Sequence, residues 1–413
     1  MAKWAVVEMK LAMRFQLFVL SILLCLSAPL LADDYLEYTD LRDQAWAAID
    51  AKDYSAAYKL YQQLVEKGDP AGHYGLALAY MEGRGVAEND AAGVDWMRKA
   101  ADLNYGSAIT GLGLAYEQGE GVAKDIDKAN ELYRMAAEKG DARGTYYLGL
   151  NHLLGLGLEK STTLAAPWLR KAAEKGNYEA MFELGKLLEK GEGVSKNAME
   201  AVGWYTVAAS GGHAASEFVL GTSYDFADPL EENDELAFFW YKRAADQDYV
   251  DAYNNLGNAY RLGNGTDKNI DLAVSYFEKG VAGDDPYAMT NLAEILIAGE
   301  GVKPNRAKGL ALLERAVKKD HPRAMVELAL AISLGKDRST NLKSAAMLYT
   351  KAAALEDARA MRLLAAAYAK GEGLSVDVKS AKQWYLKAVD AGDDDAMAEM
   401  QAFDEAQRTA KSG

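Results

Sequence analysis

The chain has 413 residues, of which 50% are hydrophobic and 26% charged, with 46 Lys and Arg against 61 Asp and Glu. This charged fraction excludes a protein built mainly of membrane spans, and this apolar fraction excludes a largely disordered one. The net charge of −15 argues against nucleic acids and anionic membrane surfaces as partners, because binding to both depends on Lys and Arg. The length is compatible with two or three globular domains or with one long array.

The N-terminal residues 1–32 have the pattern of a secretory signal peptide. Lys10 and Arg14 precede an apolar run that ends at Leu26, and small Ala32 precedes an acidic stretch. This order predicts export with cleavage after Ala32, or less favourably after Ala28. An uncleaved anchor is the alternative, because the uncharged stretch reaches the lower limit for a membrane span. Met13 is an alternative start, since the leader is complete from there.

The predicted mature chain has no cysteine, because the only one in the sequence is Cys25. It therefore cannot form disulfides, use thiol chemistry or ligate a metal through Cys, and it must be held together by packing.

A leucine recurs every 36 residues with no insertion, and Met400 takes the next position in the same frame. The leucines are Leu76, Leu112, Leu148, Leu184, Leu220, Leu256, Leu292, Leu328 and Leu364. Columns of small residues and of large apolar residues keep the same step; the large column includes Trp96, Trp168, Trp204, Trp240 and Trp384. A fixed period of this length predicts a repeat architecture.

Each repeat is predicted to form two helices. In the first helix Ala108, Leu112 and Tyr116 are spaced by four. The second helix again has helical spacing, carried by Ala129, Leu132, Tyr133, Ala136 and Ala137. Gly119 follows the first helix, where glycine adopts the left-handed conformation at low cost. In other repeats, residues of the N-cap type such as Asp141 precede the first helix. Pro70, Pro286 and Pro322 occupy the first turn of their helices.

The motifs Leu112-Gly113-x-x-Tyr116, Gly119-x-Gly121-Val122, Trp204-Tyr205 and 171–176 (KAAEKG) resemble those of Sel1-like repeats, a subfamily of the tetratricopeptide superfamily. The resemblance implies an all-α, right-handed solenoid of helical hairpins. A single hairpin cannot cover its own apolar face, so stacked repeats share one continuous core.

The repeat frame divides the predicted mature chain into three parts. Nine repeats cover residues 71–394, residues 33–70 form a divergent tetratricopeptide-like capping hairpin, and residues 395–413 form a capping helix with a polar tail. Two loops, 227–230 and 335–338, lack the Gly-x-Gly pair. Sequence drift is the main interpretation, and a specialised contact loop is the alternative.

No pattern in the sequence indicates a catalytic, cofactor or metal site. The Gly-x-Gly pairs lie between helices. A dinucleotide site would require them to follow a strand, and no strand is predicted before any of them. His73, His152, His213 and His321 have no short metal-ligand spacing, and no nucleophile elbow is present. The protein is therefore predicted to be non-enzymatic, without cofactor or metal.

The first helices are expected to line a concave groove, as the resemblance implies. Residues two before and two after the leucine, and five or six after it, should point into this groove. The predicted peptide-binding residues are Tyr74, Tyr146, Phe182, Phe218, Asn254, Asn258, Arg261, Arg323, Arg359 and Arg362.

The character of this predicted groove changes along the chain from aromatic, through amide, to basic. Asn258 resembles the asparagines that hold peptide backbone in tetratricopeptide grooves, although the segment is also close to the superfamily consensus. Arg359 and Arg362 are expected to meet an acidic group of the partner. Arg362→Ala should then weaken binding and leave stability nearly unchanged, whereas Leu256→Ala should damage the core.

The resemblance and the leader together predict a periplasmic adaptor or regulator of a Gram-negative cell that binds a protein or an extended peptide, with no membrane insertion after cleavage. A polysaccharide-binding or export-associated envelope module is the alternative, because the rings of Tyr74, Tyr146 and Phe218 can stack on sugars.

Overall fold

The structure, a computed structural model, describes residues 32–333 and 338–412, and over these ranges it consists of 21 α-helices with no strand. The predicted signal peptide lies outside the described residues except for Ala32, which begins the first helix, and most of the divergent loop 335–338 also lies outside them. The chain divides into two compact units, Met1–Asn177 and Tyr178–Gly413, which are described separately.

Unit 1 (Met1–Asn177) contains eight described helices. They are α2 (Ala32–Asp50), α3 (Tyr54–Glu66), α4 (Pro70–Met81), α5 (Asp90–Asp102), α6 (Gly106–Gln118), α7 (Ile126–Glu138), α8 (Ala142–Leu154) and α9 (Thr162–Glu174).

Unit 2 (Tyr178–Gly413) contains thirteen described helices. They are α10 (Tyr178–Lys190), α11 (Ala198–Ser210), α12 (Ala214–Asp225), α13 (Asp234–Asp246), α14 (Val250–Leu262), α15 (Ile270–Ala282), α16 (Pro286–Ala298), α17 (Arg306–Val317), α18 (Pro322–Ser333), α19 (Arg338–Ala354), α20 (Ala358–Lys370), α21 (Val378–Asp390) and α22 (Ala396–Ser412).

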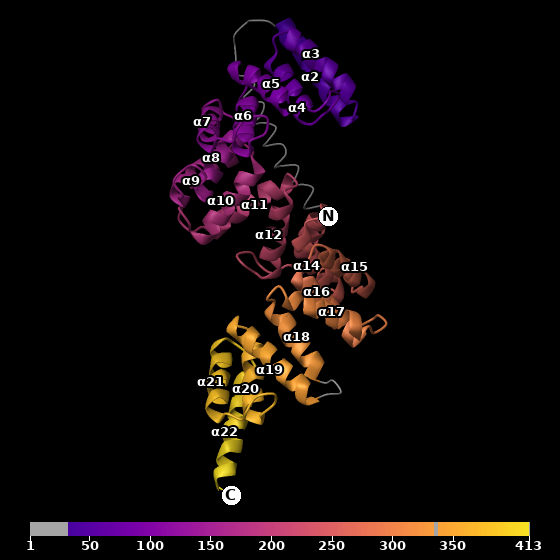
Figure 1. Cartoon of the computed structure of the whole chain (residues 1–413), viewed down its shortest axis with the longest axis vertical. Helices are drawn as coiled ribbons and strands as arrows, with labels where there is room; N and C mark the ends of the chain where they lie inside the picture. Colours follow the sequence, from indigo (N-terminus) through magenta and orange to yellow (C-terminus); the bar gives the residue numbers. More distant parts are fainter. Residues whose placement is uncertain (1–31, 334–337, 413) are drawn as a thin grey trace. The chain divides into compact units, whose positions relative to one another are not determined.

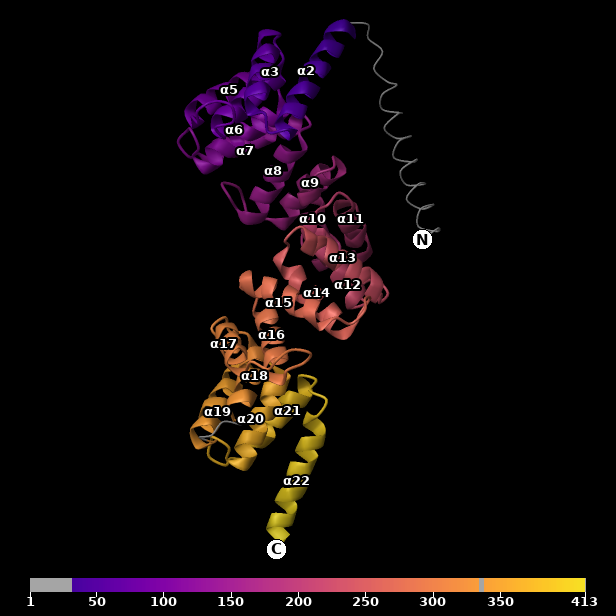
Figure 2. The same ribbon diagram turned by 90° about the vertical axis from the view of Figure 1, so that its right-hand side faces the viewer.

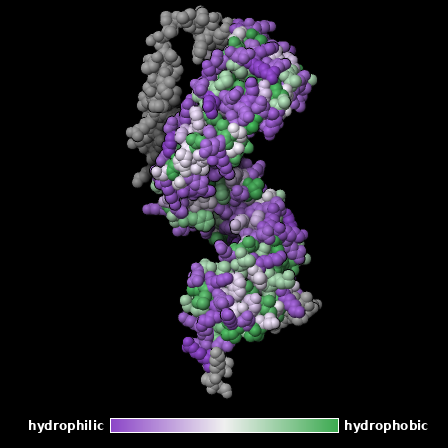
Figure 3. All heavy atoms as spheres, turned by 60° about the vertical axis from the view of Figure 1, so that its left-hand side comes forward, coloured by the Kyte–Doolittle hydropathy of each residue, from purple (hydrophilic) through white to green (hydrophobic). Residues whose placement is uncertain are grey.

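Within each unit, consecutive helices pack as hairpins, and each hairpin contacts the next one along the chain (Figures 1 and 2). The all-α solenoid architecture is therefore confirmed. On the face shown in Figure 3, hydrophilic side chains predominate and hydrophobic side chains form smaller patches between them. No helix among the described residues is long and apolar enough to span a membrane.

The helix ends follow the capping residues. The Asp141 carboxylate accepts a hydrogen bond of 2.7 Å from the Gly144 backbone N–H at the start of α8. Gly119 ends α6 in the left-handed region at φ 82°. Ala227 has a positive φ of 53° at the equivalent position of one divergent loop, so this position is left-handed without glycine.

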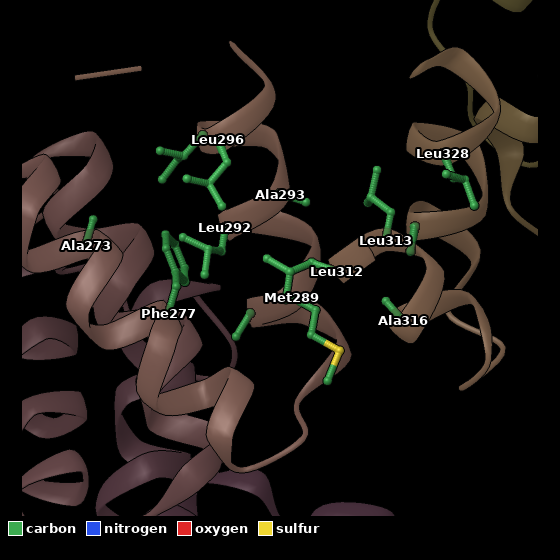
Figure 4. Close-up of a cluster of buried hydrophobic side chains, with 13 residues drawn as sticks. Ala273, Phe277, Met289, Leu292, Ala293, Leu296, Leu312, Leu313, Ala316 and Leu328 are labelled. Carbon is green, nitrogen blue, oxygen red and sulfur yellow. The ribbon is translucent and has the colours of Figure 1, made fainter. Parts of the chain in front are cut away.

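The nine leucines of the 36-residue frame form the core. All are buried, with exposed fractions from 0 to 7%. Figure 4 shows one such cluster in unit 2, where Leu292 and Leu328 belong to the frame and Phe277, Met289 and Leu313 pack around them. Within each unit, buried clusters contain residues of neighbouring hairpins, so adjacent repeats share their core.

The largest core side chains lie one residue after the predicted tryptophan column. Tyr205 and Phe277 are 2% and 0% exposed, whereas Trp204 is only partly buried. Each of these rings packs against the glycine that follows a leucine of the frame, Gly185 for Tyr205 and Gly257 for Phe277. A Cβ at Gly257 would be 2.6 Å from a ring atom of Phe277, so glycine is required for the ring to approach its helix.

The second glycine of the Gly-x-Gly loop has a separate role. Gly265 has a positive φ of 67°, and a Cβ there would clash with the backbone carbonyl oxygen of Asp234, at the start of α13 in the preceding repeat. The loop of one repeat thus rests on the backbone of the previous one.

Candidate functional site

The candidate site is a cavity of about 640 Å³ in unit 2, formed by the end of α12 together with α13, α14, α16 and the start of α18. We call it the amide groove. Its lining includes Asn254, Asn255, Asn258, Asn264, Asn291, Tyr241, Asp225, Phe226, Leu262, Tyr287, Arg261 and Arg323.

The periodicity of α14 explains how the amides reach this cavity. Leu256 and Gly257 are both buried in the hairpin core. Asn254 and Asn258 are two residues to either side of the leucine, so they leave the core face and reach the cavity. Asn291 lies 36 residues after Asn255 and brings an amide to the same cavity from α16.

Five of the polar side chains are joined by a chain of four hydrogen bonds. Asn291 Nδ2 donates to Asn254 Oδ1 at 2.7 Å, and Asn254 Nδ2 donates to Asn255 Oδ1 at 3.1 Å. Asn255 in turn hydrogen-bonds the Tyr241 side chain. The Tyr241 hydroxyl donates to Asp225 Oδ2 at 2.9 Å. This network fixes the orientation of the amides before any ligand is present.

Burial of Tyr241, followed by the nearby Asp225 carboxylate, raises the pKa of the Tyr241 phenol. Both effects disfavour the phenolate, so the hydroxyl keeps its proton and remains a donor to Asp225 at neutral pH.

Asn258 is not part of this chain. Its amide has no hydrogen-bond partner among the described residues, and the side chain is only partly buried. A primary amide offers donors and an acceptor together, which matches the N–H and C=O of a peptide backbone.

Large apolar side chains lie around the amides. Phe226, Leu262 and Tyr287 all line the groove and are 71%, 65% and 57% exposed. The groove therefore combines exposed apolar side chains with oriented amides. This combination suits an extended peptide, which has polar backbone groups and apolar side chains.

The arginines of the groove are held by carboxylates of the same unit. Arg261 is 19% exposed and bonds Glu300 at 2.7 Å and Glu294 at 3.2 Å. Arg323 forms an ion pair with the other oxygen of Glu294. The Arg261 guanidinium lowers the pKa of Glu300, so this pairing persists at neutral pH.

The predicted basic end of the groove is corrected by the structure, because its positive charges are already balanced. Arg359 pairs with Glu327, and Arg362 pairs with Asp393, Glu399 and Asp395. Arg362 is only 13% exposed and connects α20 to the segment before α22 and to α22 itself. Peptide binding by these two residues stays a prediction, but their charge is not available without breaking an internal pair.

The structure distributes the ten predicted residues over several places. Asn254, Asn258, Arg261 and Arg323 come together in the amide groove. Arg323 and Arg359 line a second cavity of about 470 Å³ in the same unit.

The predicted aromatic residues pack against neighbouring rings. Phe182 contacts Tyr205 and His213, and Phe218 contacts Tyr241 and Tyr249. In unit 1, Tyr146 packs on Tyr147 and Tyr74 on Tyr105. Tyr74, Tyr146 and Phe218 therefore each pack against different aromatic rings, and these rings belong to the same unit as the residue that they contact.

The described residues contain no group of three or more His, Cys, Asp or Glu placed to hold a metal ion. The ring of buried His321 packs edge-on against the ring of Tyr287, with 4.4 Å between the ring centroids. Burial lowers the pKa of the His321 imidazole. His213 caps α12, where its side chain accepts from the Ser216 backbone N–H.

Sequence reasoning did not select Asn291, Asn264, Leu262 or Tyr287. A signal for Asn291 was present, because in the 36-residue frame only Asn255 and Asn291 place an asparagine immediately before the core leucine. The exposure of Leu262 and Tyr287 depends on the tertiary structure and had no such signal.

Comparison with known proteins gives the relationships of the chain. The Sel1 repeat family model matches ten segments: 50–69, 70–105, 106–141, 142–177, 179–213, 214–249, 250–285, 286–321, 322–357 and 358–393. No curated protein matches the sequence.

Two solved structures are similar over most of the chain. A protective antigen of uropathogenic Escherichia coli with an SLR fold is 25% identical with a TM-score of 0.72, over 90% of this chain and 82% of that one. A Sel1 repeat protein of Oxalobacter formigenes is 27% identical with a TM-score of 0.54, over 75% of this chain and 89% of that one. With its repeats matched almost without a gap from residue 50 to residue 393, the chain belongs to the Sel1 repeat family, whose members are generally non-catalytic scaffolds for protein interaction.

Proposed function

We propose that the protein is an exported adaptor or regulator that holds an extended segment of a partner protein in the amide groove. The observation that carries the proposal is Asn258, a half-buried amide without a partner in the described chain, next to amides already oriented by the chain of bonds from Asn291 to Asp225.

An extended peptide has backbone N–H and C=O groups that pair with nothing in its own chain, and burying them unpaired is costly. Asn258 can donate to a carbonyl and accept from an N–H at once. Successive side chains of an extended segment point to opposite sides, so alternate apolar side chains can contact Phe226, Leu262 and Tyr287. Aromatic and apolar anchors of this kind supply most of the affinity of peptide interfaces.

The charges in the groove do not favour an acidic segment. Arg261 and Arg323 are neutralised by Glu294 and Glu300, and Asp225 and Asp234 also line the cavity. The ligand that fits is a segment with apolar residues at alternate positions and little negative charge.

Substitution of Asn258 tests this site. Linear 12-residue peptides are selected from a displayed library on the full chain, and enriched sequences are synthesised and titrated by calorimetry. We expect Asn258→Ala to weaken their binding by about tenfold or more, because the buried peptide group loses both of its partners.

Asn341→Ala, an amide of α19 outside the groove, is the matched control and should leave the affinity unchanged. The proposal is wrong if enriched peptides bind the Asn258→Ala chain as tightly as the original, or if the library yields no binder.

The proposed location is the periplasm of a Gram-negative cell. It is supported by the leader, in which two basic residues, an apolar run and small Ala32 precede Asp33. We expect the N-terminal sequence of the protein recovered from a periplasmic fraction to begin at Asp33. Protein that retains residues 1–32 and stays with the membrane fraction would show the anchor alternative instead.

A further inference from the structure

A second cavity, of about 470 Å³, lies in unit 1 between α2, α3 and α4. We call it the aromatic cup and define it by Trp46, Tyr54, Tyr61, Tyr74, Leu78 and Tyr105. It shares no residue with the amide groove, and the proposed function does not use it.

The cup combines partly buried tyrosines with an exposed aromatic edge. Burial raises the pKa of Tyr61, Tyr74 and Tyr105. Trp46, by contrast, leaves 69% of its surface exposed beside them. The cavity is lined by tryptophan, tyrosine and arginine, the residue types that contribute most to binding in protein interfaces.

The charged groups of the wall are already paired. Arg42 donates two hydrogen bonds of 2.7 Å to the buried Asp69 carboxylate, and Arg84 lies 2.7 Å from Glu82. A ligand group that enters the cup therefore meets no unbalanced charge, and the part that enters should itself be uncharged.

Two of the hydroxyls that line the cup are already engaged. Tyr58 shares its hydroxyl with Tyr80 at 3.2 Å, and Tyr74 is bonded by Arg143. A sugar would bury several hydroxyls, each of which needs a partner, whereas an apolar side chain needs none.

The cup also differs from the amide groove, because no Asn, Gln, Ser or Thr lines it. It offers no side-chain amide to an extended backbone, so a segment that satisfies its own backbone groups is favoured. A helix does so and presents apolar side chains along one face.

The segment that forms most of the cup is acidic in composition. Residues 39–90 carry nine Asp and Glu against five Lys and Arg. The face of a bound helix that remains in solvent is therefore favoured when it is basic.

From these observations we propose that the aromatic cup binds an amphipathic helix of a partner protein, with its apolar stripe on Trp46 and the tyrosines and its polar face rich in Lys or Arg.

The test uses a displayed library of 18-residue helical peptides. One face varies among Leu, Phe, Trp and Ala at positions i, i+3 and i+7, and the opposite face varies among Lys, Gln and Glu. Selection on the full chain should enrich large apolar residues on the first face and Lys on the second. A synthetic peptide of the enriched sequence should bind the Trp46→Ala chain about tenfold or more weakly.

Trp46→Ala removes an exposed side chain, so its circular dichroism and unfolding curve should match those of the original chain. Leu164→Ala, which removes a 43% exposed leucine from α9 outside the cup, is the matched control and should bind normally. Proline in the middle of the peptide should abolish binding, because the helix breaks. Asn258→Ala should have no effect, which separates this proposal from that for the amide groove.

Absence of enrichment, equal binding to the Trp46→Ala chain, or tolerance of the proline would each overturn the proposal. An array of neutral oligosaccharides is probed in parallel. Binding of a sugar that is lost in Trp46→Ala would also overturn it, by assigning the cup to glycans.

Discussion

Gly265→Ala is expected to destabilise unit 2 by about 3–5 kcal/mol, because it combines a left-handed conformation with a steric clash. The added Cβ would meet the carbonyl oxygen of Asp234, a backbone atom that cannot rotate away. The loop and the start of α13 would have to separate, which opens the contact between two repeats beside the amide groove.

Gly263→Ala is the matched control for this prediction. Gly263 also has a positive φ, of 88°, but a Cβ there would meet nothing closer than 3.5 Å. Only the conformational cost of about 1–2 kcal/mol should remain. Urea unfolding gives the free energies, and hydrogen exchange of the α13 and α15 amides locates the loss. Similar losses for the two variants would show that the clash with Asp234 is relieved at no cost.

Arg362→Ala is expected to destabilise the C-terminal end of unit 2 by about 2–3 kcal/mol, because breaking a largely buried ion pair leaves a carboxylate without its partner. Arg362 is 13% exposed and Asp393 is 9% exposed, so the carboxylate that remains has little access to water. The first region to fray should be α22, since Arg362 bonds Glu399 of that helix.

Arg359→Ala provides the comparison, because Arg359 is 47% exposed and, among the residues that the structure describes, pairs only with Glu327. Exposed pairs contribute up to about 1 kcal/mol, so this variant should unfold almost like the original chain. Hydrogen exchange of the α22 amides and thermal unfolding distinguish the two variants. Unchanged exchange in α22 after Arg362→Ala would restore the interpretation from sequence, in which Arg362 is a binding residue with no structural role.

The two candidate sites suit different partners for one physical reason, which is the supply of hydrogen-bonding side chains. The amide groove offers Asn258 to an unpaired backbone, whereas the aromatic cup offers rings and no amide. Each site is confined to one unit and can be removed by a single substitution, Asn258→Ala or Trp46→Ala. A partner that needs both sites would lose affinity with either change.

The sequence by itself determined the helices, their core faces and their ends. A step of 36 residues places every leucine of the frame on the same face of its helix, and all nine are buried. The cap at Asp141 and the turn at Gly119 depend on residues within a few positions of each other, so local sequence was sufficient to predict them.

Only the tertiary structure decided which residues of different repeats meet. The contact of Gly265 with Asp234, the pairing of Arg362 with Asp393 and the bond from Asn291 to Asn254 each join residues about 30 or more positions apart. Helical periodicity gives the face on which a side chain lies but not the neighbour that it meets. That neighbour depends on the angle and distance at which one hairpin stacks on the next, and these follow from the packing of many side chains together.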